Sequence, residues 1–326
     1  MKKYILLPTV LILIGCLNKD APSVNPFSQS EIFLELQLQS EIQFVGKWKV
    51  RRVSSTSNTS DNTQSKNNNQ TCQIYNFEMF NDNTFIIKSV DADGNYGFIT
   101  GKYATYYEEI VVQDEIPFIY LFQDNFNISG LIDYSQAFAT IENLVFTPEG
   151  AQFDYFPIED DYCLNSSYNY EAEKEELVLP QDEGDVLNSL FNNWNLRNLI
   201  VTVDDSSQTG FQCEVIRQTF EECFNSGCEI PERISLDLTP YGSYYWKYIG
   251  ANGATIKIED AFWKLDETDT TGRSLLIKYD EQTPWLDSYP ILIEELNETD
   301  LILIESRQDI TYTYRLTLNE VESCEF

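Results

Sequence analysis

Two tryptophan-centred segments, far apart in the chain, share the pattern that most constrains the fold. Residues 44–53 read FVGKWKVRRV and residues 190–201 read LFNNWNLRNLIV, so both contain Trp-x-Val/Leu-Arg, at Trp48 and Trp194. Each segment is followed by a polar loop, a cysteine and a series of strand-like segments. Because 326 residues are enough for two domains, the repeat predicts two similar domains in tandem.

The segments after each tryptophan alternate apolar and polar residues and are rich in Tyr, Phe, Ile and Val. Residues 81–84 (Asn-Asp-Asn-Thr) and 239–242 (Thr-Pro-Tyr-Gly) occupy matching hairpin tips. Gly94 and Gly253 supply a second turn with positive φ, as two-residue hairpins require. Period-2 alternation with turns every 8–12 residues predicts an all-β fold with antiparallel strands.

The first copy resembles the lipocalins, which carry Gly-x-Trp in their first strand, as Gly46 to Trp48 do here. Residues 80–85 (Phe-Asn-Asp-Asn-Thr-Phe) are similar to a hairpin of lipocalin-like domains in exported bacterial lipoproteins. The resemblance implies two up-and-down β-barrels in tandem, with Gly46, Trp48 and Trp194 closing them. The second copy departs from it, because Asn192 replaces the glycine. Another β-sandwich is the alternative fold.

In a barrel, the alternation places one set of side chains toward the interior, where it fills the core or lines a cavity for one small ligand. The expected inward residues are Tyr75, Phe77, Met79, Phe85, Ile87, Ile234, Leu236 and Leu238. We expect this set to form core more often than cavity lining. The sequence therefore names no ligand-binding residue.

Composition shifts give the expected boundaries of the units. The lipocalin-like domains are predicted at residues 41–163 and 184–326. The acidic segment 164–183 is predicted to be a linker, and residues 16–40 a tether. Residues 1–15 are predicted to be a signal peptide, because two lysines precede an apolar run that is shorter than the about 20 residues of a membrane-spanning helix.

The apolar run ends in Leu-Ile-Gly-Cys at residues 13–16, which resembles the lipobox of bacterial lipoproteins. The resemblance implies cleavage before Cys16 and lipidation of its sulfur. Two or more acyl chains attach a protein stably to a membrane. We therefore expect the protein to attach to a membrane through this lipid anchor. The expected location is the bacterial outer membrane, with exposure at the cell surface as a further possibility. The alternatives are an ordinary signal peptide or an uncleaved anchor.

Six of the seven cysteines follow the lipobox, and an even number in an exported chain predicts disulfides. Alignment of the two copies matches Cys72 with Cys228, and Cys163 and Cys324 each end a unit. The predicted pairs are Cys72–Cys163, Cys228–Cys324 and Cys213–Cys223.

The charge of the chain excludes several classes of function. With 21 Lys and Arg against 53 Asp and Glu, the net charge of −32 offers no basic stripe for nucleic acid. There is no histidine, which excludes Ser-His-Asp and Cys-His mechanisms in their usual form and removes the commonest zinc ligand. We assign no catalytic residue, no metal site and no cofactor, although carboxylate chemistry stays open.

The leading functional hypothesis is a non-enzymatic, membrane-anchored lipoprotein. It would bind a small hydrophobic ligand in a barrel or serve as an envelope assembly component, with an envelope protein as its partner. A surface module that binds glycans or proteins through its loops is the second hypothesis, and a carboxylate-based hydrolase is the third.

Overall fold

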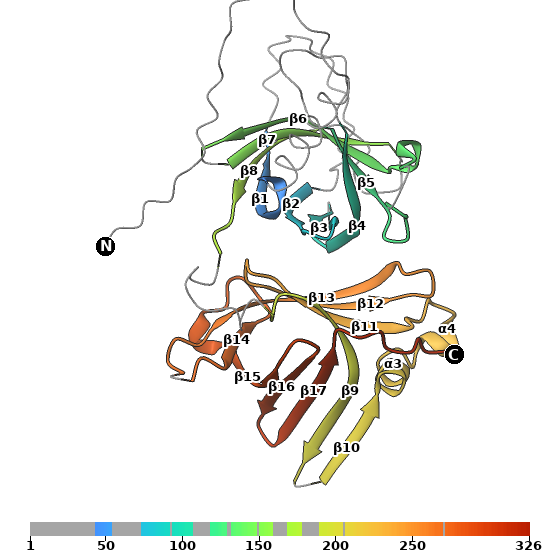
Figure 1. The fold of residues 1–326 in the computed structure, drawn as a ribbon, viewed down its shortest axis with the longest axis vertical. Helices are drawn as coiled ribbons and strands as arrows, with labels where there is room; N and C mark the ends of the chain where they lie inside the picture. Colours follow the sequence, from blue (N-terminus) through green and yellow to red (C-terminus); the bar gives the residue numbers. More distant parts are fainter. Residues whose placement is uncertain are drawn as a thin grey trace, which may run out of the picture.

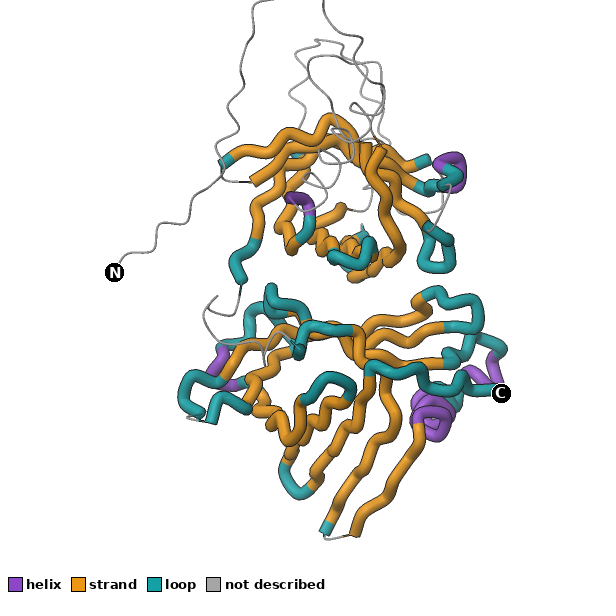
Figure 2. Tube along the Cα trace, viewed as in Figure 1, coloured by secondary structure: helices purple, strands orange, loops and turns teal. Residues whose placement is uncertain are grey.

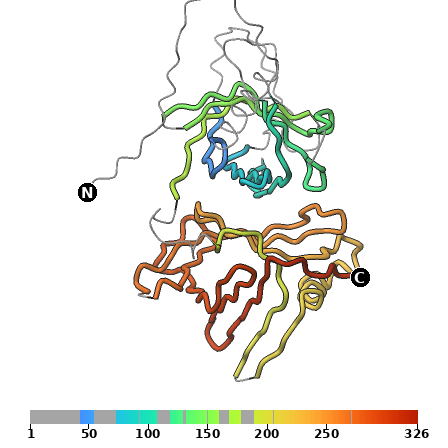
Figure 3. Tube along the Cα trace, viewed as in Figure 1, coloured from blue at the N-terminus to red at the C-terminus, as the bar shows by residue number. Residues whose placement is uncertain are grey.

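The computed structural model describes residues 43–53, 73–91, 93–106, 118–128, 132–148, 150–158, 168–177, 189–204, 206–269 and 271–326. These residues form two eight-stranded antiparallel barrels, one above the other in Figure 1. Each barrel is built from one continuous part of the chain, as the colours of Figure 3 show. The few helical segments lie at the edges of the strands (Figure 2). The predicted all-β tandem architecture is confirmed.

The first barrel follows the up-and-down order, in which each strand pairs with the next and β1 pairs with β8. Its elements are β1 (Gly46–Arg52), β2 (Gln73–Met79), β3 (Thr84–Val90), β4 (Tyr96–Tyr106), β5 (Phe118–Phe122), η1 (Tyr134–Gln136), β6 (Ala139–Thr147), β7 (Gly150–Pro157) and β8 (Tyr168–Lys174).

Strand β8 lies inside the segment that was predicted to be a linker, so this barrel extends to Lys174 rather than ending at residue 163. Tyr170 and Ala172 point into the barrel, and the glutamates between and beside them point outward. The acidic composition of the segment is therefore the outer face of a strand, which the composition alone did not distinguish from a linker.

The interior of the first barrel is filled by its own side chains. Phe153, at its centre, lies 5.6 Å from the ring of Phe77 and 5.8 Å from the ring of Tyr170, between ring centroids. Of the inward residues expected from the sequence, Phe77, Met79, Phe85 and Ile87 belong to this core. Tyr75 does not, because a β-bulge in β2 shifts the register between Ile74 and Asn76.

The second barrel contains the remaining elements. They are β9 (Asn193–Val203), β10 (Ser206–Phe211), α3 (Gln212–Thr219), α4 (Cys223–Ser226), β11 (Arg233–Leu238), β12 (Ser243–Ile249), β13 (Thr255–Leu265), β14 (Ser274–Lys278), η2 (Trp285–Asp287), β15 (Tyr289–Leu296), β16 (Asp300–Arg307) and β17 (Ile310–Thr317). Ile234, Leu236 and Leu238 face its interior, as predicted.

Strand β9 divides one of its edges between two partners. Its first residues pair with β11, while its second half pairs with β10, which projects with it at the bottom of Figure 1. The chain then returns through α3, whose buried Gln212 accepts a hydrogen bond at Oε1 from the backbone N–H of Ile234 (2.9 Å). Ile216 of α3 packs against Leu196, Ile234 and Tyr248. Helix α3 thus covers the part of the barrel where β9 changes its partner from β11 to β10.

The two barrels repeat the same local contacts. The indole N–H of Trp48 donates to the carbonyl of Phe44 (2.8 Å), and that of Trp194 to the carbonyl of Leu190 (3.0 Å). The first hairpin tip has positive φ at Asn83 in one barrel and at Gly242 in the other.

The second turn also has positive φ at the predicted residues, Gly94 (85°) and Gly253 (81°). The turns are longer than the two-residue type that was predicted, since the strands end at residues 90 and 249 and restart at 96 and 255. Asp91 accounts for the extra length in the first barrel, because its carboxylate accepts hydrogen bonds from the backbone N–H groups of Asp93 and Asn95.

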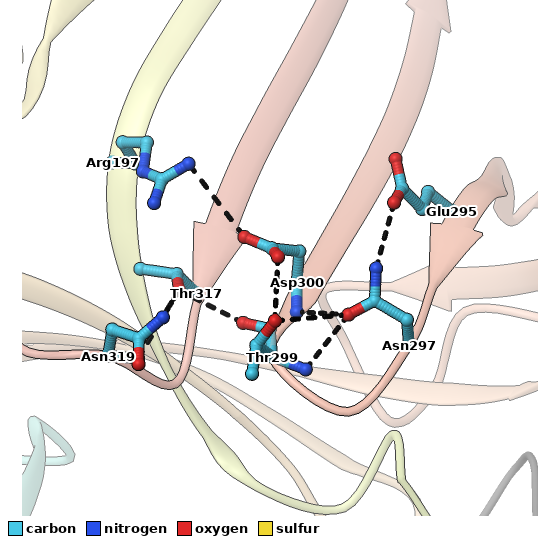
Figure 4. Close-up of polar contacts among 7 residues, drawn as sticks. All are labelled: Arg197, Glu295, Asn297, Thr299, Asp300, Thr317 and Asn319. Carbon is cyan, nitrogen blue, oxygen red and sulfur yellow. Dashed lines mark hydrogen bonds and ion pairs between the residues drawn. The ribbon is translucent and has the colours of Figure 1, made fainter.

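A hydrogen-bonded turn between β15 and β16 lies at the Trp194 end of the second barrel (Figure 4). The Oδ1 atom of Asn297 accepts from the backbone N–H groups of Thr299 (2.9 Å) and Asp300 (2.8 Å). The Thr317 hydroxyl donates to the carbonyl of Thr299 (3.0 Å), and Arg197 pairs with Asp300 across 3.8 Å. This network ties β9, β16 and β17 together where the strands meet.

The disulfides of the second barrel correct the predicted pairing. Cys213 is bonded to Cys324, and Cys223 to Cys228. The alignment of the copies gave the wrong pairs because β10 and the two helices, which carry these cysteines or lead to them, have no counterpart among the described residues of the first barrel. The C-terminal segment is joined to α3 by Cys213–Cys324, and the N–H of Cys324 donates to the carbonyl of Glu232, directly before β11. The predicted pair Cys72–Cys163 lies outside the described residues.

Candidate functional site: a cleft between the barrels

The barrels meet through the outer faces of their strands. Strands β2 to β4 of the first barrel lie over β11 to β13 of the second (Figure 1). Ile86 of β3 and Tyr245 of β12, which point away from their own barrel cores, are fully buried. The outer faces here are an interface, not a solvent surface.

The interface concentrates lysines in a chain that has few cations. Lys47, Lys88 and Lys247 are buried there, and each has a carboxylate partner. Burial lowers the pKa of Lys247, but the combined attraction of its partner Asp237 and of the nearby Asp124 and Asp82 outweighs this effect, so that its pKa is raised. Buried ion pairs are costly to break, because removal of one partner leaves an uncompensated charge.

Lys88 joins the two barrels most directly. Its side chain is 4% exposed, and its Nζ lies 2.7 Å from Oδ2 of Asp260 on β13. Three rings surround the ammonium group, with centroids 5.0 Å (Tyr245), 5.5 Å (Phe262) and 5.7 Å (Phe98) from Nζ. Such cation–π contacts are stronger when water is excluded.

Two hydrogen bonds also cross the interface. The hydroxyl of Tyr245 donates to Oε2 of the buried Glu78 (2.7 Å). The backbone N–H of Thr255 donates to Oδ2 of Asp124 (2.8 Å), which also accepts from the Thr100 hydroxyl (2.6 Å). The contacts of Lys88, Tyr245 and Asp124 fix the two outer faces against each other.

A cleft of about 560 Å³ opens beside Lys88, between the barrels. Its described lining residues are Gln73, Tyr75, Lys88, Val90, Tyr96, Phe98, Asp260, Phe262, Tyr279, Asp280 and Glu281. The volume lies within the range of about 300–1,000 Å³ that is usual for ligand pockets, and such pockets occur preferentially at domain interfaces. We refer to these residues as the inter-barrel cleft.

Aromatic rings form one wall of the inter-barrel cleft. Tyr75 and Tyr96 meet edge to face, with centroids 5.8 Å apart, and Tyr96 is 74% exposed. Burial raises the pKa of Tyr75 above its usual range, and the nearby carboxylates of Asp260 and Glu281 raise it further. The wall thus combines an apolar surface with a negative electrostatic potential.

A second cluster, at the end of the second barrel opposite Trp194, supports the cleft. Buried Glu305 accepts hydrogen bonds from Arg307 (2.5 Å) and from the hydroxyl of Tyr314 (3.0 Å). Arg307 then donates to the hydroxyl of Tyr279 (2.7 Å), and its guanidinium lies 5.3 Å from the ring centroid of Tyr289. Tyr279 lines the inter-barrel cleft, so this chain of contacts holds one cleft residue in place.

The residues predicted from the sequence lie mostly away from the cleft. Trp48 and Trp194 are buried, each in the core of its own barrel. Gly46 has φ of 138°, and an added Cβ would lie 2.6 Å from the Cε of Lys174 and 3.1 Å from the Tyr241 hydroxyl of the second barrel. Glycine at this position therefore allows a close approach of the barrels. Cys16, Cys72 and Cys163 lie outside the described residues.

No group of three or more Cys, Asp and Glu side chains in the described residues is arranged to hold a metal ion. Of the helices in the described part of the chain, none is both long and apolar enough to cross a membrane.

Comparison with known proteins adds no family. Neither protein-family models nor curated proteins match the chain. Among solved structures, it is similar to a protein of unknown function of the DUF3598 family from Nostoc punctiforme (9% identity, 88% of this chain, 99% of that chain, TM-score 0.20). It is also similar to transferrin binding protein B from Haemophilus parasuis (8% identity, 75% of this chain, 54% of that chain, TM-score 0.19). TM-scores this low support no conclusion.

Sequence reasoning missed the cleft because polar residues in alternating strands indicate a solvent-facing side. One signal was present. Phe85-Ile86-Ile87 and Tyr244-Tyr245-Trp246 are continuous apolar runs, and such runs indicate strands that are buried on both faces. The outward position of Tyr75 depends on the bulge, and bulges are frequent beside functional sites.

Proposed function

We propose that this protein is a non-enzymatic binding protein of the bacterial envelope, anchored through Cys16, that holds a small molecule in the inter-barrel cleft. The observation that carries the proposal is the cleft itself, whose volume suits a small ligand and whose wall contains Tyr75, Tyr96 and Phe98. The filled core of the first barrel argues against a ligand in that lumen. The ligand is therefore expected to present a flat or compact apolar surface to the rings.

Native mass spectrometry of the protein purified from its own membrane tests the location of the ligand. We expect a bound small molecule in the wild type and its loss in Tyr96→Ala, because this exposed ring packs mainly against the cleft. The matched control is Tyr106→Ala, another exposed tyrosine of β4 that lies outside the cleft lining. Absence of any adduct, or equal occupancy in both variants, would contradict the proposal.

The membrane anchor is tested separately. Cys16→Ser removes the sulfur that would carry the lipid, so we expect the protein to leave the membrane fraction while the barrels stay folded. An unchanged membrane fraction would overturn the anchor and leave the cleft proposal standing.

A further inference from the structure

The described lining of the inter-barrel cleft is unbalanced in charge. Asp260, Asp280 and Glu281 contribute three carboxylates, and Lys88 is the one cation among the described lining residues. Lys88 is already paired with Asp260, so Asp280 and Glu281 remain as the excess. Lys49 approaches Glu281 at 3.7 Å, but both side chains are exposed, and an exposed pair of this kind contributes little.

Rings at this interface already hold ammonium groups. Three ammonium groups lie near the ring of Phe262. The distances from its centroid are 5.2 Å to Nζ of Lys47, 5.5 Å to Nζ of Lys88 and 5.6 Å to Nζ of Lys278. Each of these lysines is more than nine-tenths buried. Tyr75 and Tyr96 line the same cleft, and among the described residues no lysine or arginine lies over their rings. The carboxylates of Asp260 and Glu281 lie near Tyr75.

We infer that the inter-barrel cleft selects an organic cation, an ammonium compound with a compact apolar body. Its charge would lie near Asp280 and Glu281, and its apolar groups would contact Tyr75, Tyr96 and Phe98. Aromatic faces attract cations and recognise quaternary ammonium ligands. The nearby carboxylates attract the same charge. An anion would be repelled by the excess carboxylates, and a neutral ligand would gain no attraction from them. The inference rests on the proposed function, because it specifies the ligand of the same cleft.

The long-range field acts in the same direction. The net charge of −32 raises the local concentration of cations around the protein, and the low-dielectric walls of a cleft focus such a field. Association should therefore weaken as salt screens the charges, with a Debye length of about 8 Å at physiological ionic strength.

Titration calorimetry of the full-length protein in detergent tests the inference with choline, spermidine and tyramine, and with the uncharged carbon isostere of choline. At least one cation should bind about tenfold more tightly than the isostere, in line with cation–π and charge contacts of this size. The variant Asp280→Asn, Glu281→Gln removes both excess carboxylates of the cleft, so it should weaken cation binding about tenfold. Asn at position 280 retains an acceptor for the N–H of Gln282, so the turn is kept. The charge-matched control Asp309→Asn, Glu320→Gln, at exposed positions outside the cleft lining, should leave binding unchanged.

Three results would overturn the inference: no binding by any of the three cations, equal binding of the isostere, or equal loss in the control variant. These results differ from failure of the proposed function, which is judged by whether the co-purified adduct depends on Tyr96. A neutral adduct that is lost in Tyr96→Ala would keep the binding cleft and reject the cation.

Discussion

The first barrel closes through β1 and β8 around a core of aromatic side chains, whereas the second divides the edge of β9 between β10 and β11. The second barrel covers this division with α3 and joins the helix to the C-terminal segment through Cys213–Cys324. Both barrels therefore hold a core of buried side chains, and the second also has a covered opening with a covalent link. The shared inter-barrel cleft requires both barrels to keep their outer faces in place.

The largest effect should come from removing a ring in the core of the first barrel. Phe153→Ala removes a ring that contacts Phe44, Phe77 and Tyr170, and it should lower the free energy of unfolding by about 3–5 kcal/mol. Tyr289→Ala in the second barrel, where the side chain is 45% exposed, should cost less than about 1 kcal/mol. Denaturant unfolding measures both, and equal costs would show that Phe153 is not central to the packing of the first barrel.

The covalent link distinguishes the second barrel. The Cys213–Cys324 bridge spans 111 residues, for which the chain-entropy model gives about 5 kcal/mol, while Cys223–Cys228 spans 5 residues and gives about 2 kcal/mol. Replacing the first pair with alanines should therefore destabilise the protein more than replacing the second. Hydrogen exchange should show the loss in β9, β11 and α3 but not in the first barrel. An equal loss of protection in both barrels would contradict the view that this disulfide stabilises only the second barrel.

The interface should respond asymmetrically when its central ion pair is broken. Asp260→Ala leaves the buried Lys88 without a counter-charge and should cost about 3 kcal/mol. Lys88→Met leaves only Asp260, whose side chain is 33% exposed and can be hydrated, so the cost should be about 1 kcal/mol. The double variant should recover most of the Asp260→Ala loss. Equal costs for the two single variants would show that Lys88 is not desolvated.

Alkaline pH should destabilise the two barrels to different extents, and this difference should be smaller than the effects above. Burial raises the pKa of Tyr170 in the first barrel to about 12, and it also raises the pKa values of Tyr244, Tyr248 and Tyr314 in the second. An unfolded tyrosine loses its proton near pH 10, so the native state binds more protons above that pH, and stability falls as pH rises from about 10.

Tyr170→Phe should remove about 2–3 kcal/mol of the loss between pH 10 and 12, a change that follows from about 1.4 kcal/mol for each pKa unit. More tyrosines with a raised pKa lie in the second barrel than in the first. As the pH rises, the second barrel should therefore lose its protection against hydrogen exchange first. Simultaneous loss in both barrels, or a pH dependence that the Phe variant does not change, would contradict this assignment.

The repeat of Trp48 and Trp194 and the alternation of apolar residues were sufficient to predict tandem antiparallel barrels. The limits of the prediction have physical causes. The linker was placed over β8 because outward glutamates resemble a solvated segment. The disulfides of the second barrel depend on the return of the C-terminal segment to α3, a long-range contact that cysteine spacing does not encode. The cleft depends on a bulge at Tyr75 and on burial of outward faces, which only the packing of two barrels produces.

We expect the ligand to lie between the barrels rather than inside one of them. A crystal structure of the protein purified from its own membrane, without added ligand, tests this most directly. The account predicts density for a small molecule against Tyr75 and Tyr96, within reach of Asp280. Density inside the second barrel beside Arg307 and Tyr314, with the inter-barrel cleft holding only solvent, would contradict it.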